Sequence, residues 1–246
     1  MHVILKKKFG QNFLIDKNIL TKISDLIPRT GLKILEIGPG DGKLTSYIIK
    51  SKPNKLTLIE IDKNLIQILK SNFKSENKVS IINTDILKYE LSEKIDLAIS
   101  NLPYNISSQI LIKFCLSKNL PEYLIFMFQK EFAKRLLDKK LNSINSLVNC
   151  FYDINFEFNV SKNCFRPIPK IESTVLLFIR KNEILINENE IKDFIRFKQT
   201  LFSHKRKILK NLLRNFNFPK NQFDLSKRVE DLSLEQLLKI FREVKL

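Results

Sequence analysis

The chain has 246 residues, of which 43% are hydrophobic, and its formal net charge at pH 7 is +17. This length predicts one large domain, or one large and one small domain, with enough apolar residues for a core. No apolar run approaches the roughly 20 residues of a membrane span, and the first residues lack the apolar core of a signal peptide. We therefore expect a cytoplasmic protein without a membrane anchor.

The positive charge is spread along the whole chain. Residues 1–182 contain 29 Lys and Arg against 17 Asp and Glu, and residues 183–246 contain 14 against 9. A basic surface on both parts is suited to a polyanion such as nucleic acid. A proteome rich in Lys, Ile, Asn and Phe would produce the same excess, so charge alone leaves both interpretations open.

The three cysteines, Cys115, Cys150 and Cys164, are widely spaced and form no Cys-x-x-Cys pair. Only His2 and His204 could join them as metal ligands. We therefore expect no metal site and no disulfide framework, and instead three small buried side chains.

Short apolar runs alternate with amphipathic stretches in the first part of the chain. After a helix over 16–26, strands are expected at 33–37, 56–61, 79–83, 95–100 and 123–128, with helices at 42–52, 63–73, 107–116 and 129–137. The strand runs are rich in Ile and Leu and do not alternate with polar residues, which is typical of strands covered on both faces. The pattern predicts an α/β fold with a Rossmann-like parallel sheet and helices on both sides.

The sequence pattern changes toward the C-terminal end. Runs at 152–160 and 174–180 follow without a clear intervening helix and could pair as an antiparallel hairpin at one edge of the sheet. Helical patterns then cover 191–216 and 234–244, with Pro219 between them. We predict a large α/β domain over residues 1–182 and a small all-helical domain over residues 183–246.

A glycine-rich loop follows the first predicted strand. Gly38, Gly40 and Gly42 are spaced G-x-G-x-G, whereas a dinucleotide fingerprint is G-x-G-x-x-G. The glycines allow a tight turn and a close approach of the backbone to a ligand. Glu36 and Asp41 would repel a pyrophosphate, but they suit a ligand with a positive end, such as the sulfonium and ammonium of S-adenosylmethionine.

Polar residues also stand at the ends of the next strands. Glu60 ends the second strand, Asp85 follows the third and Asn101 follows the fourth. Ligands of open α/β sheets bind at this edge, where Glu60 could accept both ribose hydroxyls and Asp85 an adenine amine. The placement predicts an S-adenosylmethionine-dependent methyltransferase domain over residues 1–182.

The tetrapeptide Asn101-Leu102-Pro103-Tyr104 indicates the methyl acceptor. The exocyclic amine of a nucleobase is a poor nucleophile because its lone pair is delocalised into the ring. The Asn101 side chain and the Leu102 carbonyl could accept its two N–H groups, while Pro103 would stiffen the turn and Tyr104 would offer a face for base stacking. A strand that ends in an ordinary proline turn looks the same, so the tetrapeptide is informative only together with the cofactor loop.

Over essentially its whole length the sequence resembles the ribosomal RNA adenine N6,N6-dimethyltransferase family. The matching segments are the glycine loop, the 101–104 tetrapeptide, FGQNFL at 9–14, QKE at 129–131, FRPIPKIES at 165–173 and FSHKRK at 202–207. The resemblance implies dimethylation of two adjacent adenosines in the 3′-terminal hairpin of small-subunit ribosomal RNA, with S-adenosylmethionine as cofactor, during ribosome biogenesis.

The resemblance also implies site residues. Cofactor contacts are implied at Asn12, Leu14, Gly38, Glu60, Asp85 and Asn101. Phe165 matches an aromatic residue that can sandwich the target base opposite Tyr104, although it is also an ordinary core candidate. Two departures from the family pattern are Glu172, where Asp is usual, and the segment 138–147, which is shortened and lacks the usual Tyr-Gly near the RNA.

Further RNA contacts are expected on the C-terminal domain. The residues concerned are Lys205, Arg206, Lys207, Lys210 and Arg214, which share a basic face if 191–216 is helical. Such a face would hold the RNA backbone in a salt-sensitive way, whereas a merely solvated surface would have the same composition.

Other functions remain open at this point. A large-subunit ribosomal RNA adenine methylase of the macrolide-resistance type shares the Asn-x-Pro-Tyr logic, but Gly38-Pro39-Gly40 and the 202–207 segment favour the small-subunit family. A non-catalytic RNA- or DNA-binding assembly factor is disfavoured by the intact cofactor loop, and a DNA adenine methylase by the lack of a recognition domain. We expect a monomer that acts on an immature small-subunit particle.

Overall fold

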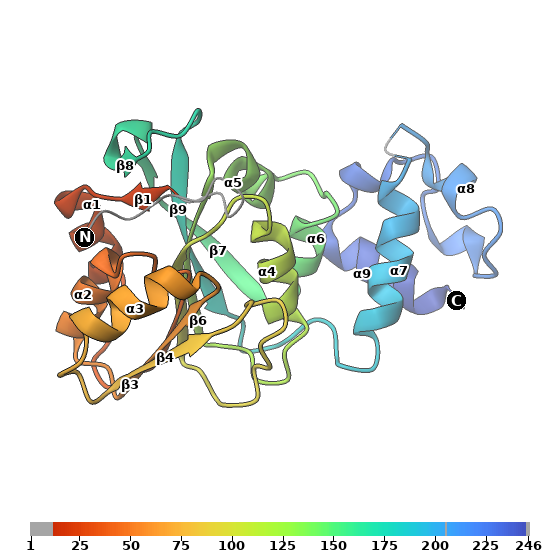
Figure 1. Ribbon diagram of the computed structural model, residues 1–246. Helices are drawn as coiled ribbons and strands as arrows, with labels where there is room; N and C mark the ends of the chain where they lie inside the picture. Colours follow the sequence, from red (N-terminus) through yellow and green to blue (C-terminus); the bar gives the residue numbers. More distant parts are fainter. Residues whose placement is uncertain (1–11, 205, 245–246) are drawn as a thin grey trace. The chain divides into compact units, whose positions relative to one another are not determined.

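The computed structural model describes residues 12–204 and 206–244 (Figure 1). They belong to two compact units: the sheet unit combines Met1–Ala133 with Asp153–Arg180, and the helical unit combines Lys134–Tyr152 with Lys181–Leu246. The helical unit thus takes in residues 134–152, which the predicted boundary at residue 182 leaves in the larger domain. The functional division into two domains stays a prediction.

The sheet unit is built on a seven-stranded sheet with the order β4-β3-β2-β5-β6-β9-β7. The strands are β2 (Lys33–Ile37), β3 (Lys55–Glu60), β4 (Val79–Asn83), β5 (Leu97–Asn101), β6 (Tyr123–Gln129), β7 (Tyr152–Val160) and β9 (Ser173–Arg180). The strands from β4 to β6 pair in parallel, and β9 pairs antiparallel with β6. The predicted α/β fold is confirmed, with every parallel strand within two residues of its expected bounds.

The strand order reverses between β2 and β5. The chain runs outward from β2 through β3 to β4 and then returns to add β5 on the other side of β2. Such a switch point leaves a crevice at the carboxyl ends of the strands, because the connections on its two sides lead to opposite faces. The motif residues expected at strand ends are therefore carried to one place.

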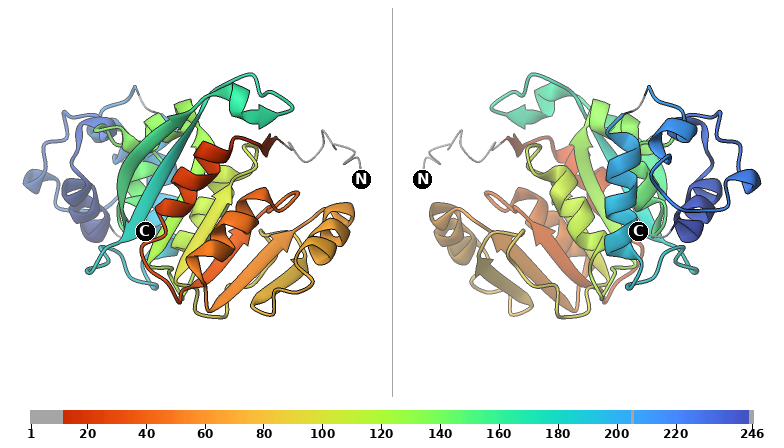
Figure 2. Two further views of the ribbon diagram at one scale, coloured as in Figure 1. Left: turned by 90° about the vertical axis from the view of Figure 1, so that its left-hand side faces the viewer. Right: turned by 90° about the vertical axis from the view of Figure 1, so that its right-hand side faces the viewer.

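Helices cover both faces of this sheet. The helices α1 (Lys17–Asp25), α2 (Lys43–Ile48) and α3 (Lys63–Asn72) lie on one face, and α4 (Ser107–Cys115) lies on the other (Figure 2). The central strands are accordingly buried on both sides, and Leu35, Leu56 and Ala98 have no exposed surface. Continuous burial explains why these strands read as unbroken apolar runs.

A second, two-stranded sheet joins distant parts of the chain. Strand β1 (Phe13–Leu14) pairs antiparallel with β8 (Phe165–Arg166), with Phe13 opposite Arg166 and Leu14 opposite Phe165. The Ile15 amide donates to the Cys164 carbonyl at 2.8 Å. The expected edge hairpin is present, because β7 and β9 are neighbours at one edge of the large sheet. The connection between them is long and includes β8.

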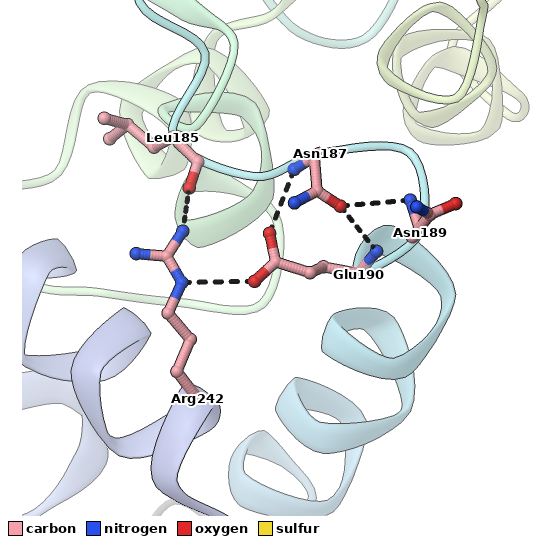
Figure 3. Close-up of polar contacts among 5 residues, drawn as sticks. All are labelled: Leu185, Asn187, Asn189, Glu190 and Arg242. Atoms are coloured by element: carbon pink, nitrogen blue, oxygen red, sulfur yellow. Dashed lines mark hydrogen bonds and ion pairs between the residues drawn. The ribbon is translucent and has the colours of Figure 1, made fainter.

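The helical unit contains α6 (Asn145–Val148), α7 (Ile191–Phe202), α8 (Leu209–Leu212) and α9 (Leu234–Glu243), and the residues of α5 (Lys130–Leu137) are divided between the two units. Arg242 ties α9 to the start of α7, because its guanidinium donates to Glu190 at 3.2 Å and to the Leu185 carbonyl at 2.7 Å (Figure 3). The buried ammonium of Lys198 donates to Ser143, which anchors the 134–152 segment to α7 within this unit.

The prediction of one helical stretch over 191–216 is wrong. Helix α7 ends at Phe202, and the backbone amides of Leu209 and Lys210 donate to the carbonyls of Lys227 and Leu225 instead of to the preceding turn. The chain between the helices is therefore diverted into non-helical backbone. Arg206 and Lys207 lie in that turn, Arg214 follows α8, and Lys205 lies outside the described residues. The basic residues do not share one helix face.

Residues 12–204 and 206–244 contain neither a membrane-spanning helix nor a metal-binding cluster. No helix among them is long and apolar enough to cross a membrane. Nor do three or more His, Cys, Asp or Glu side chains gather in a way that could hold a metal ion. Cys115 and Cys150 are buried, as the sequence predicts, whereas Cys164 is only partly buried.

Candidate active site

A cavity of about 240 Å³ lies in the sheet unit at the carboxyl ends of the parallel strands. Its walls come from β1 and from the segments that follow β2, β3, β4 and β5. The lining residues predicted from the sequence are Asn12, Leu14, Glu36, Gly38, Gly40, Asp41, Glu60, Asp85, Asn101, Leu102, Pro103 and Tyr104. The fold therefore brings together most of the predicted site, with Phe165 as the exception in this unit.

The glycine loop forms the floor on the β2 side. Gly38 has φ of +62°, which disfavours any other residue, and a Cβ added there would meet no atom within 4 Å. The backbone thus faces open space that a ligand can approach closely. Gly40 is needed for a different reason, since a Cβ there would lie 2.7 Å from the Phe13 ring.

Glu60 is fixed at the end of β3 by two backbone donors. One carboxylate oxygen accepts the Asp62 amide at 2.9 Å and the other accepts the Gly40 amide at 3.2 Å. Burial raises the pKa of Glu60 above its ordinary value, while these hydrogen bonds act against the shift. Each oxygen has a second lone pair, so the carboxylate can still accept two hydroxyl groups.

Glu36 is the most deeply buried acid of the cavity wall. Its carboxylate accepts the Thr45 hydroxyl at 2.6 Å, and burial raises its pKa to about 8. A cationic ligand nearby would favour the ionised form. Asp41 is less enclosed and forms an ion pair with Lys43 at 2.5 Å. The glycine loop is therefore flanked by two carboxyl groups, which suits a ligand with a positive end.

Asp85 lies across the cavity, after β4. One of its oxygens accepts the Leu87 amide at 2.9 Å, which fixes the turn that follows the strand. The cavity wall continues there with Thr84, Ile86 and Leu87. An apolar wall beside one fixed carboxylate suits a flat ring that carries an amine.

Asn101 ends β5, and Asn12, the residue before β1, sets the orientation of its side chain. The amide nitrogen donates to the Asn12 carbonyl at 3.0 Å, so the amide oxygen remains as the acceptor. Leu102, which follows, is 2% exposed and lines the same cavity. The Asn101 amide oxygen is thus left as an acceptor at the cavity wall, next to the buried Leu102.

Tyr104 is held by a residue to which the sequence analysis gave no role. Its hydroxyl lies 2.7 Å from the Ser173 hydroxyl, at the start of β9. Burial raises the pKa of Tyr104 and keeps the phenol neutral. Ser173 belongs to the 165–173 segment of the family resemblance, so its position carried a signal, but only the structure supplies its partner.

Phe165 does not line the cavity. Its side chain is fully buried and packs in the core cluster that contains Leu14 and Leu20. Stacking of Phe165 against a target base stays a prediction, and it would require the ring to leave this core. The basic residues of the C-terminal part belong to the helical unit.

The comparison with protein families decides what kind of site this is. The model of the family described as ribosomal RNA adenine dimethylase matches residues 3–246. The chain belongs to this family. Among curated proteins, the chain is similar to ribosomal RNA small subunit methyltransferase A of Mycoplasma capricolum, with 37% identity and 96% of each chain covered. The protein of the same name from Pelagibacter ubique is 40% identical, and the match covers 94% of this chain and 88% of that protein.

Solved structures agree with this dimethylase assignment. A dimethyladenosine transferase from Plasmodium falciparum superposes with a TM-score of 0.83 at 26% identity, covering 93% of this chain and 95% of the other. A 23S ribosomal RNA methyltransferase superposes with a TM-score of 0.76 at 22% identity and shares the fold. The predicted family, fold and enzyme class are confirmed.

The dimethylase is an S-adenosylmethionine-dependent methyltransferase of ribosomal RNA, and the small-subunit relatives support the predicted substrate over the large-subunit alternative. The cavity fits this cofactor on structural grounds. A Cβ at Gly38 would project into open space, and Glu60 and Asp85 offer carboxylate oxygens on its walls. These residues suit the nucleoside, and Glu36 and Asp41 suit the charged end.

Proposed function

We propose that the enzyme dimethylates the N6 amines of two adjacent adenosines in the 3′-terminal hairpin of small-subunit ribosomal RNA. We further propose that the substrate is an immature small-subunit particle and that the enzyme acts as a cytoplasmic monomer. One observation carries the chemistry: the Asn12 carbonyl accepts the Asn101 amide N–H, which leaves the Asn101 oxygen as an acceptor in the cavity that Tyr104 also lines.

Each cofactor-binding residue has a defined task in this proposal. Glu60 accepts the ribose hydroxyls and Asp85 accepts the adenine amine of the cofactor, while Gly38 admits its amino-acid portion. Leu14 of β1 and Asn12, just before β1, cover it. When bound, S-adenosylmethionine supplies an electrophilic methyl group on a sulfonium.

The target adenine must leave its stack to reach the cavity, as in other enzymes that modify bases. Tyr104 holds it by stacking, a contact worth about 1–3 kcal/mol per base. The Asn101 oxygen and the Leu102 carbonyl accept the two N–H groups and aim the amine lone pair. Much of the acceleration then comes from positioning two reactants.

Proton removal needs no dedicated base. The N6 proton becomes acidic only after the nitrogen has gained the methyl group, so it can pass to water. The neutral Tyr104 phenol is hydrogen-bonded to the Ser173 hydroxyl, and in this proposal it serves stacking rather than proton transfer.

The basic residues of the C-terminal part contact RNA in this proposal. Arg206, Lys207, Lys210 and Arg214 lie on short, non-collinear segments rather than on one helix face. Together with Lys205, they would hold phosphates at different points of a folded RNA instead of along one groove.

The test uses methyl-labelled S-adenosylmethionine with unmethylated small subunits, large subunits and protein-free RNA in separate reactions. Nucleoside analysis should find N6,N6-dimethyladenosine mainly from small subunits, much less from protein-free RNA, and none from large subunits. Label in large-subunit RNA would contradict the proposed substrate. Equal labelling of protein-free RNA would contradict the proposal of a particle.

A further inference from the structure

A loop beside the active site presents apolar side chains to solvent. The connecting loop, residues 167–172, leads from β8 to β9. Ile168 is 53% exposed and Ile171 is 42% exposed. Single exposed apolar residues are common on protein surfaces and need no explanation. Two isoleucines three positions apart, in one short loop at a binding site, are a feature to explain.

Both ends of the connecting loop are anchored. At the first end Arg166 is paired with Phe13 across the small sheet. At the other end the Glu172 carbonyl accepts the Lys130 amide at 3.0 Å, and the Glu172 carboxylate accepts the Lys130 ammonium at 2.6 Å. Pro169, between the isoleucines, is buried. The loop is thus held so that the two isoleucines stay outside the core.

The anchors also fix where the isoleucines lie. Ile171 is two residues from Ser173, whose hydroxyl touches the Tyr104 hydroxyl, so its Cα lies within about 7 Å of that serine. Ile168 is two residues from Arg166, whose partner Phe13 lines the cavity. The apolar tip of the loop is therefore tied through Ser173 and Arg166 to Tyr104 and Phe13, two residues of the cavity wall.

Charge indicates what covers this tip. Arg166 and Lys170 are exposed beside the isoleucines, and the only acid of the loop, Glu172, is already paired with Lys130. A surface of apolar side chains between cations matches a nucleic-acid stack, with bases in the middle and phosphates on both sides. An acidic protein surface would match the cations but would leave the isoleucines against charged groups.

We propose that Ile168 and Ile171 form a wedge that enters the RNA stack where the target adenine has flipped out, while Arg166 and Lys170 contact the adjacent phosphates. This inference rests on the proposed adenine methylation and specifies how the same site opens the RNA. Flipping leaves a gap between neighbouring bases, and apolar side chains of nucleic-acid-binding proteins fill and stabilise such unstacked steps.

The test compares an Ile168→Ser/Ile171→Ser variant with the wild-type protein and with Leu116→Ser. Leu116 is 46% exposed at the end of α4 and does not line the cavity, so its variant controls for a general loss of surface apolarity. The probe is an RNA hairpin with two adjacent adenosines in a stacked loop, one of them replaced by 2-aminopurine. A second hairpin has abasic sites beside the adenosines, so no stack has to be opened.

Wild-type protein and Leu116→Ser should raise the 2-aminopurine fluorescence, and the double variant should lose most of this rise. With unsubstituted adenosines, its kcat/KM should fall roughly 10- to 100-fold on the stacked hairpin, the size of a lost stacking contact, and less than about 3-fold on the abasic hairpin. Cofactor affinity, measured by calorimetry without RNA, should not change.

Several results would overturn the wedge. In fluorescence, these results are a full rise with the double variant or no rise with the wild-type protein. In kinetics, an equal loss of kcat/KM on both hairpins would overturn it. A loss of methylation by the double variant only on protein-containing particles would show instead that the tip contacts a protein. Fluorescence is measured without methyl transfer. A wild-type rise without any methylated adenosine would therefore refute the proposed function and leave the wedge in place.

Discussion

The sequence correctly predicted that residues at the strand ends meet in the cavity. It wrongly predicted that the basic segment, residues 203–214, is part of one helix. In the cavity, residues from separate segments converge as expected, including Glu60, Asp85 and Asn101. In the basic segment, residues expected on one helix face are separated by a turn. Parallel strands must bring their carboxyl ends to one edge, whereas a helical pattern does not state where the helix stops.

The largest effect is expected at Asn101, one of the residues that meet in the cavity. Asn101→Ala removes the oxygen that accepts the adenine amine, so kcat should fall about 10²- to 10³-fold, as when one preorganised polar contact is removed from other active sites. Cofactor affinity should weaken much less, because Gly38, Glu60 and Asp85 remain.

Single-turnover methylation and calorimetry separate these two quantities. Asn119→Ala is the matched control, since Asn119 is an exposed asparagine that does not line the cavity. Unchanged turnover in Asn101→Ala would contradict the assigned role of the tetrapeptide.

Sequence-based prediction reached its limit where tertiary contacts decide. The strands and glycine loop follow from apolar runs and from residues that allow positive φ, so local patterns identify them. The Thr45 contact to Glu36 and the Ser173 contact to Tyr104 join residues from different elements, and no local pattern encodes them. Phe165 illustrates a second limit. The sequence does not distinguish an aromatic residue that stacks on a base from one that packs in the core, and Phe165 is fully buried.

The next prediction concerns electrostatics that the sequence did not reveal. Burial raises the pKa of Glu36 to about 8. Folded protein therefore keeps this proton between about pH 4.5 and 8, whereas unfolded chains release it near the ordinary value. The unfolded state binds fewer protons in this window, so the free energy of unfolding should fall as pH rises through it.

Glu36→Gln should remove this pH-dependent part of the free energy of unfolding, which amounts to a few kcal/mol at about 1.4 kcal/mol per pKa unit. Denaturant unfolding of the cofactor-free protein at pH 5, 6.5 and 8 measures it. Because Glu60 shifts in the same direction, the difference between wild type and variant is the relevant quantity. Parallel stability profiles would show that Glu36 is ionised throughout.

The basic segment should show a smaller and salt-dependent effect. Neutralising Lys205, Arg206 and Lys207 should weaken RNA binding and reduce the slope of log K against log salt by about 2, at roughly 0.7–0.9 per phosphate contact. Filter binding from about 50 to 200 mM salt measures the slope. A charge-matched control neutralises the exposed residues Lys63, Lys70 and Lys74 instead. An equal change in both variants would mean that net charge, not this segment, holds the RNA.

The smallest expected effect tests the contact that links β5 to β9. Ser173→Ala removes the hydrogen bond to the Tyr104 hydroxyl but leaves the ring, so kcat/KM should fall up to about 10-fold, the value of one net hydrogen bond. Tyr104→Phe removes the same bond from the other side while keeping the stacking face. If the bond positions the ring, the double variant should lose no more than either single variant, because both delete one interaction. Additive losses would instead mean that Ser173 and Tyr104 act separately, and that the ring of Tyr104 is held by its packing alone.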